Sequence, residues 1–497
     1  MRDKGGSVLR QFGYAKLSYP ADMLSIIKNG LEKKLYPKKV VIIGGGMAGL
    51  VAASLLKQAG HQVTILEGND RIGGRVYTVR HPFTSGNYLD VGAMRIPDNH
   101  ELVFEYIRRF KLPLNSFINS SPVDLIYANN VLTTRKVYEE TPDILRFPVN
   151  ENEKGKTATE LFLKATQPFL DLYSTSTPDE QERLKAQYSE YSMGEFLQYN
   201  PIGRPLSPYA IRSIGVMLGL EGFPEFSFVD ILTDIIFPIF SKKVKFFEID
   251  GGNDQLPLAF MKELQHNTCL NRKVDKIYQM ENGVRIQAID PKTNRRHHYE
   301  GDYAIVTVPF PVFQFIDVFP YHSISFDKWQ IIRELINLPA VKIGIEFKHR
   351  FWEKAGVGNA ITDLPSRFSY IPSHGIGSSG PAVLLGSYSW GQDAILWASL
   401  PHDEMVRELL DDLARMYGRI VYKEYMQAFS YNWSLNQFSA GAFTLFLPGQ
   451  GAKFTDVIRQ PEGRLHFAGE HTSSFHGWME GAIESGIRAA FEINERN

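Results

Sequence analysis

The sequence has very little cysteine and no long apolar run, and each absence excludes a class of protein. Cys269 is the only cysteine among 497 residues, so neither an intrachain disulfide nor a dithiol redox pair can form. The most apolar stretch, 229–240, is interrupted by Asp230, Asp234 and Pro238 and is too short to span a bilayer. The N-terminus carries charges but no apolar segment typical of a signal peptide. We therefore expect no membrane span and a cytoplasmic location.

The sequence also lacks an excess of charge of either sign. Its 54 basic and 55 acidic residues give a formal net charge of -1. This balance provides no basic surface for nucleic acid or for an anionic membrane, so neither partner is expected. Hydrophobic residues make up 43% of the chain, an ordinary share for a globular protein. The length exceeds what one hydrophobic core usually serves and predicts two or three domains.

Near the N-terminus, a short strand pattern runs into a glycine-rich turn and then into a helix pattern. The β-branched run 40–43 predicts a strand buried on both faces, and a helix is predicted from Met47. Gly44, Gly46 and Gly49 occupy the three glycine positions of the dinucleotide-binding fingerprint. These positions favour a tight turn, close approach of the backbone to a pyrophosphate, and close packing of helix on strand.

The residues that follow complete this pattern. A second strand over 62–66 delivers Glu67 about 20 residues after the glycines, where an acid can accept a hydrogen bond from a ribose hydroxyl. By contrast, 375–380 has the same glycine spacing but lies between Pro372 and Pro381, which predicts a loop. With one convincing fingerprint and one cysteine, the sequence disfavours a nicotinamide-fed reductase and a disulfide reductase. It favours a flavin that takes electrons from a small substrate and passes them to oxygen or another acceptor.

Two further segments combine glycine with arginine, and each leaves two interpretations open. At Gly73, Gly74 and Arg75, backbone N–H groups and a guanidinium could hold a phosphate or the flavin edge, or the segment could be a surface turn. Arg95 lies among apolar neighbours in 92–97. It is either a structural ion-pair partner or a fork that binds a substrate carboxylate through two parallel hydrogen bonds.

Lys342 and the C-terminal helix are the remaining candidates. In the strand pattern 341–347, alternation places Lys342 on a polar face, which predicts a solvated lysine. A helix is predicted to begin close to Gly477. Its N-terminus, with about half a positive charge, would stabilise negative charge at the pyrimidine edge of a flavin. A helix that only packs against its neighbours also fits the pattern.

Together, these segments resemble the flavin-containing amine oxidase superfamily and, within it, the L-amino-acid oxidases of bacterial type. The resemblance covers nearly the whole length, and many separated matches are more specific than any one motif. The matching stretches are 44–49 with Glu67, 73–75, 92–97, 104–110, 362–368, 467–470 and 476–478.

The resemblance implies an α/β fold with a discontinuous Rossmann-like FAD-binding domain, a mixed-sheet substrate domain and a helical insertion. The implied segments are 37–95, 243–320 and 441–497 for the FAD-binding domain, 1–36, 96–130 and 321–440 for the substrate-binding domain, and 131–242 for the helical domain.

The resemblance also implies roles for individual residues. Arg95 and Tyr388 resemble the pair that holds a substrate carboxylate. The Gly477 carbonyl resembles the acceptor of the amine, and Trp478 resembles a wall of the site. Lys342 resembles a lysine that positions a water near the flavin, which reverses the expectation from alternation. The positions that resemble FAD contacts are Gly44, Gly46, Met47, Ala48, Gly49, Glu67, Gly74, Arg75, Gly92, Ala93, Met94, Arg95, Val274, Gly469, Glu470, Gly477, Trp478 and Met479.

These resemblances predict FAD-dependent oxidative deamination of L-amino acids to 2-oxo acids, with ammonia and hydrogen peroxide as the other products. No cysteine lies near Gly477 or Trp478, so the FAD is expected to be non-covalent, and no metal ion is expected. The alternatives are an amine or polyamine oxidase, an amino-acid 2-monooxygenase of the same superfamily, and a non-catalytic flavin-bearing scaffold. The expected partners are an L-amino acid and molecular oxygen, and a homodimer is an open expectation.

Overall fold

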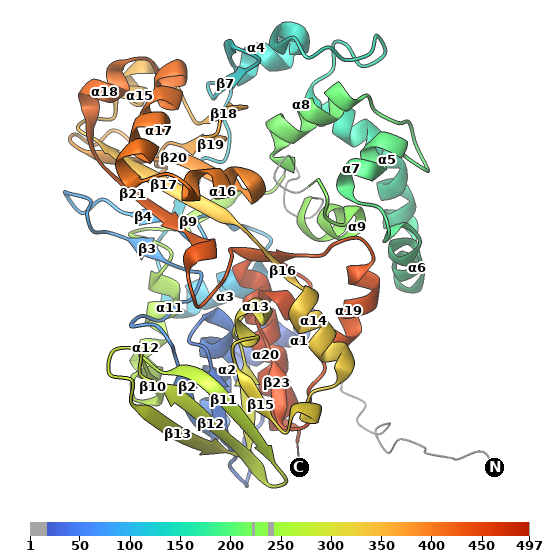
Figure 1. Cartoon of the computed structure of the whole chain (residues 1–497), viewed down its shortest axis with the longest axis vertical. Helices are drawn as coiled ribbons and strands as arrows, with labels where there is room; N and C mark the ends of the chain where they lie inside the picture. The colour runs from blue at the N-terminus through green and yellow to red at the C-terminus, as the bar shows by residue number, and fades with distance from the viewer. Residues whose placement is uncertain (1–16, 221–223, 237–242, 497) are drawn as a thin grey trace.

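The predicted strand–turn–helix unit lies in the middle of a parallel sheet. The computed structural model describes residues 17–220, 224–236 and 243–496, and Figure 1 shows this sheet in its lower half. All four pairs of neighbouring strands are parallel, so their carboxyl ends share one edge, where such sheets bind ligands. The predicted α/β unit is confirmed, and its strands come from separate parts of the chain. In sheet order they are β10 (Thr268–Cys269), β2 (Gln62–Leu66), β1 (Lys39–Ile43), β14 (Tyr303–Val306) and β23 (Leu465–Phe467).

Two helices from opposite ends of the sequence pack on this sheet. They are α2 (Met47–Gln58) and α20 (Met479–Asn494), and both belong to one buried hydrophobic cluster. A Cβ atom at Gly486 would lie 2.5 Å from the carbonyl oxygen of Ala48. The two helix backbones therefore approach so closely that only glycine fits at this position. This contact holds the C-terminal helix against the helix that follows the glycine-rich turn.

A four-stranded mixed sheet lies beside the parallel sheet. Its strands are joined in antiparallel fashion, except for the parallel pair β11 and β15. Val274, a predicted FAD contact, belongs to β11. In sheet order the strands are β13 (Arg296–Gly301), β12 (Gly283–Ile289), β11 (Lys273–Met280) and β15 (Asp317–Phe319).

A seven-stranded mixed sheet forms the upper left of Figure 1. On its long strand β17, every residue is buried, and Lys342 is only 1% exposed. The expectation from alternation that Lys342 is solvated is therefore wrong. Helix α17 covers one face of the sheet, and β3, β4 and the segment after β4 cover the other. In sheet order the strands are β21 (Tyr425–Asn432), β17 (Ala340–Phe347), β20 (Ala382–Trp390), β19 (Phe368–Tyr370), β18 (Ala360–Thr362), β7 (Leu125–Ala128) and β8 (Val131–Thr134), and the covering elements are α17 (His402–Tyr417), β3 (Thr78–Val79) and β4 (Leu89–Asp90).

Two small sheets connect these larger layers. In the first, β9 (Phe246–Ile249) lies between β5 (Ile96–Pro97) and β6 (Leu114–Ser116). In the second, β16 (Ile336–Leu338) pairs with β22 (Phe443–Leu445). Both join strands that are more than 100 residues apart, so they connect segments that are distant in the sequence.

Of the helices between β8 and β9, α5 to α9 gather at the upper right of Figure 1, and α4 lies at the top, near β7. The capping boxes that begin at Thr177 and Ser192 are present, and Thr157 begins a further one. The elements are α4 (Arg135–Glu140), α5 (Ala158–Thr175), α6 (Pro178–Tyr188), α7 (Met193–Tyr199), α8 (Pro208–Leu218), α9 (Phe228–Asp230) and the π-helical turn Ile231–Ile236.

The remaining helices are short and cover the sheets. Among the residues that the structure describes, no helix combines the length and the apolar character needed to cross a membrane. These helices are α1 (Ala21–Asn29), α3 (Glu101–Phe110), α11 (Gln255–Ala259), α12 (Met261–Leu264), α13 (Phe310–Phe313), α14 (Phe326–Glu334), α15 (Phe351–Ala355), α16 (Gly391–Ala398), α18 (Ile420–Glu424) and α19 (Gln450–Ile458).

The predicted domain boundaries remain predictions. Residues 1–16, 237–242 and 497 of the predicted segments lie outside the described residues, as do 221–223. The predicted helical segment 131–242 includes Val131–Thr134, which form the edge strand β8 of the seven-stranded sheet.

Candidate active site

A cavity of about 740 Å³ extends from the carboxyl edge of the parallel sheet to the seven-stranded sheet and the helical segment. It brings together most of the residues that the sequence nominated. Gly49 and Lys342 lie behind the lining residues and not among them. The nominated residues that line the cavity are Gly44, Gly46, Met47, Ala48, Glu67, Gly74, Arg75, Gly92, Ala93, Met94, Arg95, Val274, Tyr388, Gly469, Glu470, Gly477, Trp478 and Met479.

The glycine-rich turn presents bare backbone to one end of the cavity. Gly44 has a φ of 114°, which a residue with a side chain rarely adopts, and a Cβ there would meet the Thr307 hydroxyl. A Cβ at Gly49 would collide with the Gly44 carbonyl, so Gly49 permits the close packing of α2 on β1. Gly46 then caps α2, whose N-terminus faces the cavity. A bare turn at a helix N-terminus fits a pyrophosphate, because N–H groups and the helix dipole favour anions.

Glu67 directly follows β2 and turns its carboxylate towards the glycine-rich turn. One oxygen accepts from the Gly45 N–H at 2.7 Å and the other from the Asn69 N–H at 2.8 Å. Burial raises the pKa of Glu67, and these two N–H groups act against that rise. The side chain is thus a fixed acceptor at the cavity wall, as a ribose hydroxyl would require.

Arg75 and Glu470, both nominated as FAD contacts, form an ion pair across the cavity wall. Arg75 Nη1 lies 2.7 Å from Glu470 Oε1, and the Gly477 N–H donates to Glu470 Oε2 at 2.8 Å. Burial alone would raise the pKa of Glu470, but the Arg75 guanidinium together with His476 and His471 lowers it to about 2. Glu470 is therefore an anion that connects the Gly73–Arg75 loop to the start of α20.

Lys342 holds the segment that runs from β4 to Arg95. It lies directly opposite Tyr388 in the pairing of β17 with β20. Its Nζ atom donates to the carbonyl oxygens of Asp90 at 3.0 Å and Gly92 at 2.6 Å. Burial lowers the pKa of Lys342 to about 7 against the raising effect of Asp90. A protonated lysine has three donors, so one remains after these two bonds.

Two more buried side chains hold the carbonyls of the same segment. Trp433 Nε1 donates to the carbonyl oxygen of Val91 at 2.8 Å, and Asn253 Nδ2 donates to that of Ala93 at 2.9 Å. With the two bonds from Lys342, every carbonyl from residue 90 to residue 93 accepts from a buried side chain. The backbone that leads to Arg95 is thus held in one position. Neither Trp433 nor Asn253 was predicted from the sequence. Asn253 lies in 250–254, which has the composition of an ordinary turn.

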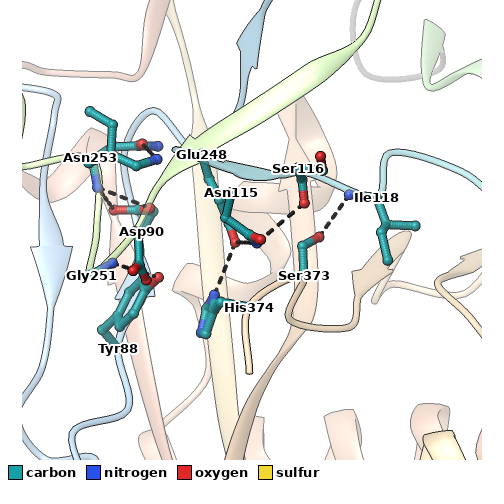
Figure 2. Close-up of polar contacts among 12 residues, drawn as sticks. Tyr88, Asp90, Asn115, Ser116, Ile118, Glu248, Gly251, Asn253, Ser373 and His374 are labelled. Atoms are coloured by element: carbon teal, nitrogen blue, oxygen red, sulfur yellow. Dashed lines mark hydrogen bonds and ion pairs between the residues drawn. The ribbon is translucent and has the colours of Figure 1, made fainter. Parts of the chain in front are cut away.

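Behind this segment lies a buried polar cluster, which Figure 2 shows. Asp90 accepts from the Asn253 N–H at 3.1 Å, and burial raises the pKa of Asp90 to about 7. Next to it, Glu248 accepts from Asn115 Nδ2 at 2.8 Å and lies 3.3 Å from His374 Nδ1. No local pattern marked these residues, because they come from strands far apart in the sequence.

Arg95 lies half-buried at the cavity wall, and its guanidinium contacts polar and aromatic side chains. It donates to Asn119 Oδ1 and to the Tyr370 hydroxyl, the latter at 3.5 Å, and lies 5.5 Å from the centre of the Phe246 ring. Burial raises the pKa of Tyr388, while a hydrogen bond from Trp390 and the charge of Arg95 act against the rise. The Tyr388 phenol therefore keeps its proton near a cation, as a clamp for a carboxylate needs.

The start of α20 forms the wall on the opposite side. Gly477 has a φ of 79°, and Trp478 caps the helix, which begins at Met479. The Trp478 ring meets the buried His100 ring edge to face at 5.0 Å. The first residues of α20 therefore line the cavity, and the His100 ring packs against Trp478.

A second arm of the cavity was not predicted from the sequence. It runs from Arg95 towards the helical segment, and its walls differ in polarity. Its polar lining residues are Asn119, Ser120, Asp124, Arg135 and Asn359, and its apolar lining residues include Phe162, Leu163, Met217, Leu218, Leu220, Ile361, Phe368, Trp390, Phe443 and Leu445.

Comparison with known proteins identifies sequence relatives over almost the whole chain. The sequence profile of the family described as "Flavin containing amine oxidoreductase" matches residues 47–494. The Bacillus subtilis (strain 168) protein named "Putative L-amino-acid oxidase YobN" is 48% identical over 476 residues, which cover 95% of this chain and 98% of that protein. The "L-amino-acid oxidase" of Siganus canaliculatus is 36% identical over 477 residues, which cover 95% of this chain and 88% of that protein.

Solved structures share the fold. Wild-type putrescine oxidase bound to putrescine matches with a TM-score of 0.75 at 20% identity, over 93% of this chain and 100% of that chain. Cyclohexylamine oxidase from Brevibacterium oxydans IH-35A matches with a TM-score of 0.74 at 21% identity, over 93% of this chain and 99% of that chain. At these identities the likeness supports the fold alone.

Proposed function

Because this chain belongs to the flavin-containing amine oxidoreductase family, we propose that it oxidises L-amino acids with non-covalently bound FAD. An L-amino acid, oxygen and water give a 2-oxo acid, ammonia and hydrogen peroxide. The chemistry that FAD supplies when bound is two-electron oxidation of the substrate amine and transfer of those electrons to oxygen. The glycine-rich turn, Glu67, Arg75 and Glu470 fit the cofactor, because they offer bare backbone, a fixed acceptor and a cation along one cavity.

The observation that carries the proposal is the pairing of a cation and a phenol at the wall of this cavity. Arg95 and Tyr388 both line it, and the charge of Arg95 acts on the Tyr388 hydroxyl. A guanidinium and a phenol can bind a carboxylate through charge-assisted hydrogen bonds. We assign carboxylate binding to Arg95 and Tyr388. Holding the carboxylate orients the α-carbon of the substrate, and this orientation supplies much of the rate.

The other nominated residues receive roles in the same proposal. The Gly477 carbonyl accepts from the substrate amine, and Trp478 forms a wall beside it. Lys342 keeps a third N–H after its bonds to Asp90 and Gly92, and this donor holds a water behind the cavity wall. The positive N-terminal end of α20 favours negative charge in the cavity.

Arg95→Met tests the proposal. The change removes charge-assisted hydrogen bonds worth about 1.5–3 kcal/mol, or more where the carboxylate is left buried and unpaired. We expect kcat/KM for L-phenylalanine to fall about ten- to several-hundred-fold. Phenethylamine has no carboxylate, so its slow turnover should not fall. Arg108→Met is the matched control, because the Arg108 side chain is 65% exposed on α3.

Each outcome separates the proposal from its rivals. Unchanged L-phenylalanine turnover in Arg95→Met would remove Arg95 from the site. Faster oxidation of phenethylamine than of L-phenylalanine by the unmodified enzyme would favour an amine oxidase, and an amide product would favour a monooxygenase. If no amino acid reduces the flavin under argon, the chain is a non-catalytic scaffold. A cytoplasmic location and a homodimer are also proposals, and sedimentation of the purified protein tests the latter.

A further inference from the structure

A strip of polar groups runs along the second arm of the cavity, with an arginine at each end. At the inner end, Arg95 donates to Asn119 Oδ1. Asn359 Nδ2 lies 3.4 Å from the Asn119 carbonyl, and the Asn359 N–H donates to Asp124 Oδ1 at 3.1 Å. At the outer end, Arg135 Nε lies 3.3 Å from Asp124 Oδ2. All five residues line the cavity, so the strip connects the predicted carboxylate clamp to a second guanidinium.

The opposite wall of this arm is apolar, and its exposure shows where the arm opens. Phe162 on α5 and Met217 on α8 are 3% and 5% exposed. Their neighbours Leu163 and Leu218, which also line the cavity, are 44% and 37% exposed. The side chain of Arg135 also lines the cavity and is 23% exposed, so it is reached both from the cavity and from solvent. This part of the cavity offers apolar side chains beside polar ones, which suits a molecule with an apolar side chain and a charged end.

Arg135 is oriented by the Asp124 carboxylate, which has no capacity left to accept further hydrogen bonds. Asp124 is 1% exposed and accepts from the Ser121 N–H at 2.9 Å and the Ser121 hydroxyl at 2.7 Å, besides Asn359 and Arg135. Within the described residues, Nε is the guanidinium nitrogen of Arg135 that the protein engages. Its terminal nitrogens are left to meet a ligand, and a guanidinium edge suits a carboxylate.

The position of Arg135 is not explained by the helix on which it lies. Arg135 is the first residue of α4, where the helix dipole disfavours a cation. The pair with Asp124 offsets this effect, and the Arg135 side chain also lines the cavity.

We propose that Arg135, oriented by Asp124, is a docking subsite that receives the carboxylate of an incoming amino acid before it reaches Arg95. This inference rests on the proposed function for the identity of the substrate. The preferred ligand is a carboxylate that carries an apolar side chain, because that side chain slides along Phe162, Met217 and their neighbours. The terminal nitrogens of Arg135 give the incoming carboxylate a first hydrogen-bonding partner, which speeds its association.

Benzoate tests the subsite without any turnover, because it has the carboxylate and an apolar ring but no amine to oxidise. Rapid mixing of benzoate with the flavin-loaded enzyme, followed by tryptophan fluorescence, gives kon and koff, since Trp390 and Trp478 line the cavity. In Arg135→Gln, kon is expected to fall about three- to tenfold. In the final complex benzoate no longer contacts Arg135, so the substitution slows association and dissociation equally. We therefore expect koff to fall by the same factor as kon, and Kd not to change.

Three controls separate docking from structural damage. Lys136→Gln removes the same charge from the next residue of α4, which is exposed and does not line the cavity, and leaves kon unchanged. Arg135→Lys keeps the cation and restores part of kon. Salt slows benzoate association in the unmodified enzyme more than in Arg135→Gln, because screening removes an attraction that the variant lacks.

The outcomes distinguish this inference from the proposed function. Equal kon in Arg135→Gln and the unmodified enzyme overturns the docking subsite, and so does a changed Kd at constant kon. If kon behaves as expected but no amino acid is oxidised, the proposed function fails and the carboxylate subsite stands. If amino acids are oxidised while kon is insensitive to Arg135, the proposed function stands and the subsite fails.

Discussion

Two lysines of this chain, Lys328 and Lys342, are buried in almost the same chemical surroundings. They are 0% and 1% exposed. Each donates to two backbone carbonyl oxygens and lies about 4.5 Å from the centre of an aromatic ring. Burial lowers the pKa of each to about 7. Neither burial nor titration therefore distinguishes the two lysines, and the difference between them lies in the backbone that each one holds.

Lys328 holds the end of a helix. Its Nζ atom donates to the carbonyl oxygens of Ile458 and Gln460, each at 2.8 Å. Ile458 is the last residue of α19, and the last carbonyls of a helix have no partner within the helix. A cation there satisfies those carbonyls and suits the helix dipole. None of these groups lines the cavity, so Lys328 serves the fold.

Lys342 holds the wall of the candidate active site. Its acceptors, the carbonyls of Asp90 and Gly92, belong to the segment that continues into Arg95, and Gly92 lines the cavity. The Tyr388 ring beside it belongs to the predicted carboxylate clamp. A buried lysine with a lowered pKa therefore indicates function only when the groups that it binds belong to the candidate active site.

Of the substitutions that test the difference between the two lysines, Lys342→Met should have the largest effect, and the effect should be on turnover. It leaves the carbonyls of Asp90 and Gly92 without their donor, so the segment that carries Arg95 can shift. Because displacement by about 1 Å can cost a hundredfold in rate, we expect kcat/KM for L-phenylalanine to fall about a hundredfold. Steady-state kinetics on the flavin-loaded variant measure the loss. Turnover near that of the unmodified enzyme would show that Lys342, like Lys328, only supports the fold.

Lys328→Met should affect stability and leave kinetics unchanged. It removes the donor from the carbonyls of Ile458 and Gln460, which costs about 1–3 kcal/mol when they find no other partner. Urea unfolding should show a lower midpoint, while kcat per bound flavin stays at the level of the unmodified enzyme. A large fall in kcat with an unchanged midpoint would invert the assignment of the two lysines.

The smallest expected effect is a pH dependence that both lysines share. Their pKa is about 7 in the folded protein and 10.5 in the unfolded chain, so the unfolded chain binds more protons between these values. Stability therefore rises with pH in this window, and each lysine contributes up to about 1.4 kcal/mol per pH unit. Urea unfolding at pH 7.5 and pH 9 should show a shallower rise in Lys328→Met than in the unmodified enzyme. An identical rise would mean that Lys328 titrates normally. The charged groups that act on the two lysines are Glu462, Arg488 and Glu492 for Lys328, and Asp90 and Arg95 for Lys342.

The end of the cavity at the glycine-rich turn was predictable because its parts are adjacent in the sequence. The strand, the glycines and Glu67 follow one another within 39–67, and the structure has β1, α2 and β2 there. The capping boxes at Thr177 and Ser192 were predictable for the same reason, since each involves residues three positions apart.

The end of the cavity at Arg95 was only partly predictable. Arg95 was identified because a charged guanidinium is unusual among neighbours that are apolar in the sequence. Asn119 and Asn253, by contrast, look like ordinary loop residues. Trp433 contacts Val91 across 342 positions, and Arg135 lines the cavity while paired with Asp124. These contacts depend on how sheets and helices pack, which local composition does not report.

By itself, the sequence determined the parallel α/β unit, the family resemblance and the residues with unusual chemistry, because short-range sterics and motif spacing act within a few residues. The tertiary structure decided which side chains share the cavity. Alternation along β17 distinguishes its two faces, but only packing shows that both faces are covered and that Lys342 is buried opposite Tyr388. The strip from Arg95 to Arg135 likewise exists only where distant segments meet, since hydrogen bonds and desolvation depend on distance in space.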